Sequence, residues 1–332
     1  MSRIGVLGAG SWGTALADLL ARKGHAVSLW AYEPEVVTAI NAKHLNPLYL
    51  SEAPLSPTLR AVADPVAAVG AAECVLLASP SHVARRVLES VAPALAQDTL
   101  VASATKGLET DTLDLMSEVA AAVLPPHRFV ALSGPSFARE VYQQQPTAVV
   151  AAAHDLADAE QVQELFVTGY FRVYSNTDLV GTQLAGALKN VIAIAAGILE
   201  GLGLGHNPRA ALITRGLAEI ARLGAAMGAD SGTFAGLAGM GDLVLTTTGA
   251  LSRNRALGIA IAQGESLEQH RRQHRTVAEG ATTAPAAVRL AERYGVELPI
   301  IAQVADVLQA RTTPREAISA LMERALKPEQ WT

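Results

Sequence analysis

Lys189 is a charged residue inside a segment that is otherwise apolar. Apolar side chains between residues 184 and 199 recur at helical spacing and predict a helix packed in a core. A second stripe of that helix holds small residues and the lysine: Gly186, Lys189, Ala193 and Gly197. Burial at such a contact disfavours the charged ammonium and lowers its pKa toward the range of a general acid or base. We therefore predict that Lys189 transfers a proton; the alternative is a lysine whose side chain extends to the surface.

A second group of polar residues follows a glycine-broken run in the C-terminal half. Asp242 ends this run and could lie beside Lys189 and orient it, or could simply cap a helix. Ser252 has the position of a helix N-cap, so Arg253 and Asn254 would stand in the first turn. Backbone amides, helix dipole and guanidinium together favour a phosphate at such a place. We expect a phosphate site there, with a solvated basic turn as the alternative.

The N-terminus carries a glycine-rich motif of the kind that binds dinucleotides. Residues 4–7 have the pattern of a strand, the glycines Gly8, Gly10 and Gly13 follow at once, and a helical pattern comes next. Glycines permit a tight turn and a close approach of the backbone, and the helix N-terminus supplies amides for a pyrophosphate. This context predicts an NAD or NADP site; the alternative is a plain glycine-rich turn.

The second predicted strand ends at Trp30, which is where a dinucleotide's adenosine would bind. Glu33 could accept hydrogen bonds from the ribose, and Tyr32 could instead stack beside the adenine. No arginine at this strand end marks a site for a 2′-phosphate. The sequence therefore favours NAD over NADP.

Two further turns follow predicted strands in the N-terminal half. Lys106 follows the strand predicted at residues 100–102, and Gly134 and Ser136 follow the one at residues 129–132. Open α/β sheets bind ligands at the carboxyl ends of their strands. We expect these residues to line the ligand crevice; the alternatives are a solvated loop lysine and an ordinary strand-to-helix turn.

The elements that must position these residues change character near residue 180. Before it, β-rich runs alternate with helical patterns, as in a mostly parallel sheet covered by helices. After it, only helical patterns follow. We predict an α/β domain over residues 1–180 and an all-α domain over residues 181–332, and a surface loop at residues 44–57 with three prolines. The predicted strands are residues 4–7, 27–30, 59–62, 74–78, 100–102, 129–132, 148–152 and 171–174.

Composition bounds the possible partners and the compartment. Of 332 residues, 50% are hydrophobic and 17% charged, and the net charge of −5 gives no cationic field for nucleic acid. Lys189, Asn190 and Glu200 interrupt the apolar segment, so a buried helix is expected there and no membrane insertion. Cys74 is the one cysteine, which excludes a disulfide within the chain, and we expect no signal sequence, because the first predicted strand begins at residue 4. We expect a cytoplasmic protein.

His270 and His274 are four residues apart and could share one helical face. No cluster of carboxylates accompanies them, so we interpret them as part of a solvated polar turn and predict no metal site.

Taken together, the motifs resemble the bacterial-type NAD(P)-dependent glycerol-3-phosphate dehydrogenase family. The resemblance covers almost the whole chain, in the family's order, and rests on residues 8–16, 104–109, 133–138, 189–193, 239–246, 252–254 and 279–280. It implies a Rossmann-type N-terminal domain, a helical C-terminal domain and a homodimer. It also implies interconversion of dihydroxyacetone phosphate and sn-glycerol 3-phosphate with NAD(P)H, supplying glycerol 3-phosphate for phospholipid synthesis.

The resemblance further implies roles for single residues. Lys189 is the expected proton donor and acceptor, aided by Lys106 and Asp242. The expected substrate contacts are Lys106, Gly134, Ser136, Lys189, Asp242, Ser252, Arg253 and Asn254. Besides the three glycines and Glu33, the expected cofactor contacts are Ser11, Trp12, Tyr32, Lys106, Ala138, Arg253, Val277 and Glu279.

Two other functions stay open from the sequence. A related Rossmann and helical dehydrogenase acting on a hydroxyacid would also use Arg253, because a carboxylate suits a guanidinium. A non-catalytic NAD(H) redox sensor is the other, and Lys189 in a buried helix argues against it, since a sensor needs no proton-transfer group there.

Overall fold

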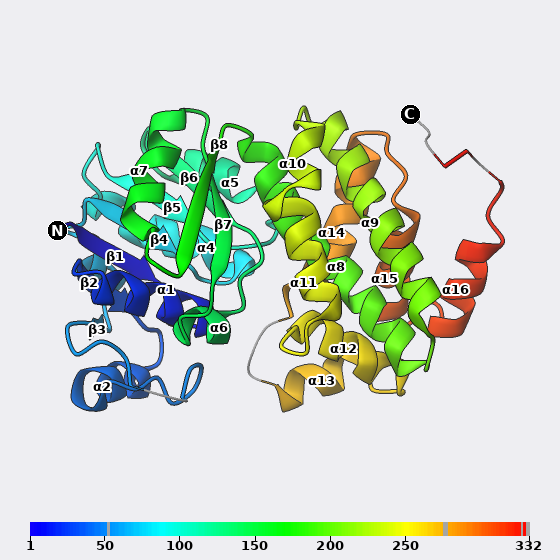
Figure 1. Cartoon of the computed structure of the whole chain (residues 1–332), viewed down its shortest axis with the longest axis horizontal. Coiled ribbons are helices and arrows are strands. Elements are labelled where there is room, and N and C mark those ends of the chain that lie inside the picture. The colour runs from blue at the N-terminus through cyan, green and yellow to red at the C-terminus, as the bar shows by residue number, and fades with distance from the viewer. Residues whose placement is uncertain (52–53, 275–277, 327, 330–332) are drawn as a thin grey trace. The chain divides into compact units, whose positions relative to one another are not determined.

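The computed structural model describes residues 1–51, 54–274, 278–326 and 328–329. The chain divides into two compact units (Figure 1). The sheet unit consists of Met1–Lys106 and Asp114–Leu179, and the helical unit consists of Gly107–Leu113 and Val180–Thr332. The predicted division of roles between residues 1–180 and 181–332 stays a prediction.

The sheet unit is built on eight strands in the order β3-β2-β1-β4-β5-β6-β7-β8. Neighbouring strands are parallel except for β6 and β7, which are antiparallel. The predicted mostly parallel sheet is therefore confirmed. The strands are β1 Arg3–Leu7, β2 Ala26–Trp30, β3 Arg60–Val62, β4 Cys74–Leu77, β5 Leu100–Ser103, β6 Arg128–Ser133, β7 Thr147–Ala152 and β8 Phe171–Asn176.

Helices cover both faces of this sheet because its central strands are apolar on both sides. Along β4, Cys74 and Leu76 belong to one buried cluster, and Val75 and Leu77 to the other, as alternation along a strand requires. The first cluster also takes side chains from α1 Ser11–Arg22, α2 Pro34–Lys43, α6 Ala138–Tyr142 and α7 Leu156–Phe166. The second takes them from α3 Pro65–Val69, α4 Ser81–Val91 and α5 Met116–Val123, and the short 3₁₀ turn η1 Ala92–Ala94 follows α4.

The helical unit contains no strand among its described residues. Its elements are α8 Leu179–Gly201, α9 His206–Ala226, α10 Ser231–Ala235, the π-helical turn η2 Leu237–Gly241, α11 Asp242–Thr248, α12 Arg253–Ala262, α13 Leu267–Gln273, α14 Glu279–Arg293, α15 Pro299–Leu308 and α16 Pro314–Met322. Helix α8 is long and apolar enough to cross a membrane, but 83% of its most apolar window is buried inside the protein. It is the core helix that the sequence predicted.

Glycines allow α8 and α12 to pack at backbone contact. A Cβ added to Gly197 would lie 2.0 Å from the carbonyl oxygen of Arg255, and one added to Gly258 would lie 2.0 Å from that of Ile194. The small-residue stripe of α8 thus permits the close approach that was expected, and the partner is α12. The contact fixes the first two turns of α12 beside the C-terminal half of α8.

Two expectations about local structure were wrong. His270 and His274 do not lie in a polar turn: the first belongs to α13 and the second caps its C-terminus. The helix forms because Ser266 and Gln269 make a capping box, a signal that the spacing S-x-x-Q carries. The loop at residues 44–57 is also not merely a surface loop, because Asn46 within it is fully buried.

Candidate active site

The glycine-rich loop joins β1 to α1 and owes its shape to missing side chains. Gly8 has a φ of +122°, a region that other residues rarely adopt. A Cβ on Gly13 would lie 2.0 Å from the carbonyl oxygen of Gly8, so the third glycine permits the close packing of helix and strand. At Gly10, by contrast, an added Cβ would meet nothing within 4 Å. The open side of the loop is therefore at Gly10, next to the first amides of α1.

The glycine-rich loop and the first turn of α1 fit the pyrophosphate of a dinucleotide. Gly10 is the N-cap of α1 and offers no capping side chain, so the amides of the first turn are left for a ligand. The indole Nε1 of Trp12 is buried and has no hydrogen-bond partner among the described residues.

At the end of β2, Tyr32 is 83% exposed, and Glu33 accepts a hydrogen bond from the hydroxyl of Tyr49 at 2.6 Å.

Lys106, Gly134 and Ser136 come together at the carboxyl ends of β5 and β6, as predicted. The Nζ of Lys106 donates to the carbonyl oxygen of Gly134 at 3.0 Å, and the hydroxyl of Ser136 donates to the same oxygen at 2.9 Å. Gly134 has a φ of +132°, and a Cβ there would lie 2.9 Å from the Cα of Val149. Ala138 begins α6 directly after this turn. A cation is thus held where parallel sheets bind ligands.

A buried ion pair joins α8 to α11 in the helical unit. The Nζ of Lys189, on α8, donates to Oδ1 of Asp242 at 2.5 Å and to the hydroxyl of Thr246 at 2.7 Å. Lys189 is 6% exposed and Asp242 is 1% exposed, so two charges are withdrawn from water. Such a pair is stable when its remaining polar atoms are also bonded, which Thr246 helps to achieve. The predicted proximity of Asp242 and Lys189 is confirmed.

Thr246 and Asn190 belong to this site and had no role assigned from the sequence. Thr246 lies four residues after Asp242, so both point to the same face of α11, and its hydroxyl also donates to the carbonyl oxygen of Asp242 at 2.6 Å. That spacing was a signal that could have identified it.

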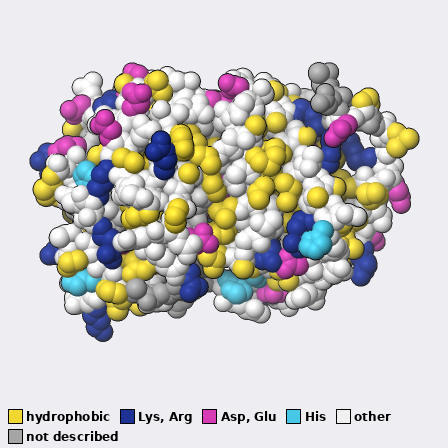
Figure 2. Space-filling view, in the orientation of Figure 1, with side chains coloured by type: hydrophobic (Ala, Val, Ile, Leu, Met, Phe, Trp, Pro, Cys, Tyr) yellow, Lys and Arg dark blue, Asp and Glu magenta, His cyan; other side chains and the backbone are white. Residues whose placement is uncertain are grey.

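The opposite face of α11 exposes Val244, and Figure 2 shows hydrophobic side chains gathered over α10 and α11.

Asn190 connects the lysine helix to the expected phosphate site. Its Oδ1 accepts from Nδ2 of Asn254 at 2.9 Å, and Oδ1 of Asn254 accepts from the amide of Gly280 at 2.9 Å. A Cβ on Gly280 would lie 2.5 Å from the carbonyl oxygen of Asn190, so this contact needs glycine. Asn190 and Gly280 thus fix the side-chain amide of Asn254 through both of its polar atoms.

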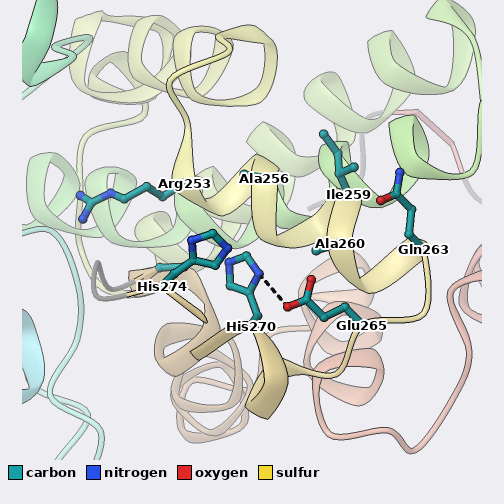
Figure 3. Close-up of a pocket in the computed structure, with 9 residues that line it drawn as sticks. Arg253, Ala256, Ile259, Ala260, Gln263, Glu265, His270 and His274 are labelled. Carbon is teal, nitrogen blue, oxygen red and sulfur yellow. Dashed lines mark ion pairs between the residues drawn. The ribbon is translucent and has the colours of Figure 1, made fainter. Parts of the chain in front are cut away.

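Ser252 caps α12, as predicted, by accepting from the amide of Arg255 at 3.2 Å. The side chain of Arg253 is partly open to solvent, but the surrounding protein atoms desolvate its guanidinium and lower its pKa. The negative charge of Glu279 opposes this shift. It lines a pocket of about 270 Å³ together with His270, His274 and Glu265 (Figure 3). In that view the Arg253 side chain extends away from Glu265, so the arginine is available to an anion at the helix N-terminus.

Two expected cofactor contacts, Glu279 and Val277, remain to be placed. Glu279 begins α14, one residue before Gly280. Val277 lies outside the described residues. Among the residues that the structure describes, no group of three histidines, cysteines or carboxylates is placed to hold a metal ion.

Comparison with known proteins identifies the family. The model for the N-terminus of NAD-dependent glycerol-3-phosphate dehydrogenase matches residues 3–159, and the model for its C-terminus matches residues 178–319. This chain belongs to that family. It is 56% identical to the glycerol-3-phosphate dehydrogenase [NAD(P)+] of Geobacter sulfurreducens over 99% of both chains.

Solved structures agree with the family. The glycerol-3-phosphate dehydrogenase of Coxiella burnetii is 40% identical, with a TM-score of 0.94 over 97% of this chain and 99% of that one. A ketopantoate reductase from Ralstonia eutropha has a TM-score of 0.61 at 19% identity, over 95% of this chain and 99% of that one. The second likeness is one of fold alone, so it gives no support to a hydroxyacid substrate.

Proposed function

We propose that this chain interconverts dihydroxyacetone phosphate and sn-glycerol 3-phosphate by hydride transfer with NAD(P)H. The observation that carries the proposal is the buried contact of Lys189 with Asp242 and Thr246 in a member of this dehydrogenase family. A buried lysine ion pair costs desolvation and is weak evidence for stability, but it suits a group that moves a proton.

The sheet unit holds the cofactor. Gly8, Gly10 and Gly13 let the backbone approach the pyrophosphate, and the amides of α1 bind its charge. When bound there, the nicotinamide would supply or accept the hydride at C2 of the substrate. Lys106, anchored on Gly134, positions the substrate and attracts its developing negative oxygen.

The helical unit supplies the proton and binds the phosphate. In the reducing direction Lys189 donates a proton from Nζ to the oxygen on C2, and in the oxidising direction the neutral amine takes it back. Asp242 and Thr246 orient the amine. Arg253 and Asn254, in the first turn of α12, bind the substrate phosphate, which lies away from the reacting carbon and helps to position it.

We also infer a cytoplasmic homodimer that supplies glycerol 3-phosphate for phospholipid synthesis. The compartment is supported by the cysteine content, because Cys74 is the one cysteine and the chain therefore lacks the disulfides that are common in oxidising compartments. The dimer and the pathway rest on the family resemblance.

The test is NADH oxidation by the purified protein with three substrates in parallel: dihydroxyacetone phosphate, dihydroxyacetone and pyruvate. We expect oxidation with the phosphate ester and a loss of about a hundredfold or more in kcat/KM without the phosphate. Oxidation with pyruvate alone would instead support a hydroxyacid dehydrogenase. NADH binding without oxidation of any substrate would support the redox sensor.

A further inference from the structure

A short loop fastens itself onto the glycine-rich turn of the sheet unit. Asn46, fully buried, donates from Nδ2 to the carbonyl oxygen of Ala9 at 2.9 Å and to the hydroxyl of Thr14 at 2.8 Å. Its Oδ1 accepts from the amides of Leu48 at 3.3 Å and Tyr49 at 3.2 Å. One buried side chain therefore fixes the backbone at Tyr49 relative to the dinucleotide turn.

Tyr49 extends this connection to both sides of the adenosine position. Its carbonyl oxygen accepts from the hydroxyl of Ser11 at 2.8 Å, and its own hydroxyl donates to Oε1 of Glu33 at 2.6 Å. Glu33 is the N-cap of α2, yet its side chain makes no capping hydrogen bond. The carboxylate is thus held by Tyr49 instead of by the helix that it precedes.

The position of Glu33 matters because it follows β2 of a dinucleotide-binding fold. A carboxylate at this strand end accepts hydrogen bonds from the ribose hydroxyls of NAD, whereas NADP needs a cation for its 2′-phosphate. Residues 30–36 and 46–50 contain the carboxylates of Glu33 and Glu35 and no lysine or arginine. Only one oxygen of Glu33 has a partner among the described residues, so the other is available to the ribose.

We propose that the Tyr49–Glu33 pair selects NAD(H) against NADP(H), with Glu33 as the discriminating group and Tyr49 as the residue that positions it. The fixed carboxylate accepts from the 2′-hydroxyl of NAD(H) and repels a 2′-phosphate at the same place. The hydrogen bond from Tyr49 prevents Glu33 from turning away into water, which is how a flexible carboxylate would evade the repulsion. This proposal rests on the proposed cofactor role of the sheet unit.

The test measures dissociation constants for NADH and NADPH by fluorescence titration, without substrate. We expect the wild-type protein to bind NADH about tenfold or more tightly than NADPH. Glu33→Gln should weaken NADH binding and tighten NADPH binding; a gain of affinity cannot come from damage to the fold. Tyr49→Phe should lower the ratio about threefold, and should change it no further in the Glu33→Gln background.

Tyr142→Phe is the matched control. The hydroxyl of Tyr142 donates to the carbonyl oxygen of Pro54 at 2.9 Å, in the same unit, without contacting Glu33. We expect its NADH to NADPH ratio to equal that of the wild type. Equal wild-type affinities, or a ratio unmoved by Glu33→Gln, would overturn this proposal alone. Absence of binding to either dinucleotide would contradict the proposed function and this proposal with it.

Discussion

The sheet unit and the helical unit build their candidate binding and catalytic groups in opposite ways. The glycine-rich loop lies within one hexapeptide and works because side chains are absent, most clearly at Gly10, where the space is open. The lysine cluster consists of Lys189, Asp242 and Thr246. It joins Lys189 to residues that follow it by 53 and 57 positions in the chain, and it depends on side chains that are present and buried. The glycine-rich loop should therefore lose its function when atoms are added, and the lysine cluster should lose its function when atoms or charges are removed.

The largest effect is expected from removing the buried charges of the lysine cluster. Lys189→Ala alone would leave Asp242, 1% exposed, as an uncompensated charge and destabilise the protein by about 3–5 kcal/mol. The double variant Lys189→Met, Asp242→Asn removes both charges at once. We expect it to fold and to lose about a thousandfold in kcat, because the proposed proton donor is gone. Stopped-flow or steady-state NADH oxidation measures the loss.

Two controls separate chemistry from folding in that experiment. The double variant should bind NADH as the wild type does, because the glycine-rich loop belongs to the sheet unit. Glu219→Gln changes another buried carboxylate of the helical unit and should keep normal turnover near neutral pH. If the double variant retained kcat within a factor of about ten, Lys189 would not be the proton-transfer group.

Adding a single methyl group tests the other half of the comparison. Gly10→Ala introduces a Cβ that meets no protein atom within 4 Å, at a φ of −65° that alanine adopts readily. The fold should be unaffected, but the methyl group would occupy the space that we propose for the pyrophosphate. We expect cofactor affinity to fall about tenfold or more, with thermal stability unchanged.

Gly169→Ala is the matched control for the loop. Its Cβ would also meet nothing within 4 Å, and Gly169 lies between α7 and β8, away from the glycine-rich turn. Both dissociation constant and stability should stay at wild-type values there. Equal NADH affinity in Gly10→Ala and Gly169→Ala would show that the open side of the loop does not face the cofactor.

The same contrast explains what could be predicted from the sequence. Strands and the glycine-rich loop are local patterns, so all eight predicted strands are present and the turn after β1 has the expected form. From the sequence, Asp242 could either lie beside Lys189 or cap a helix, and the structure shows the contact with Lys189. The chemical roles of these residues stay predictions.

Contacts between distant segments account for most of what was not predicted. No local pattern links Tyr49 to Glu33, and nothing in a proline-containing segment indicates that Asn46 is buried under the glycine-rich turn. Helix α13 and Thr246 are different cases, because a capping box and an i, i+4 spacing were present in the sequence and were not used.

Glu219 allows a finer comparison, between two buried carboxylates of the helical unit. Asp242 is paired with an ammonium, whereas Glu219 accepts from the amides of Ile300 at 2.8 Å and Ile301 at 3.2 Å, at the N-terminus of α15. Burial raises the pKa of Glu219 to about 7, although the two amides and the charges of Arg222 and Arg324 oppose the shift. The two amides and the two guanidinium charges thus offset the burial of the Glu219 carboxylate only in part.

The raised pKa predicts how this carboxylate affects stability with pH. The folded state holds the Glu219 proton more tightly than the unfolded chain, so the contribution is fully present below about pH 4.5 and is lost as pH rises through about 7. The loss amounts to about 3 kcal/mol. Glu219→Gln carries no titrating group, so urea unfolding from about pH 5 to about pH 8 should show the variant gaining stability relative to the wild type as pH rises. Parallel curves for the two proteins would mean that the amides of α15 hold the Glu219 carboxylate ionised throughout this pH range.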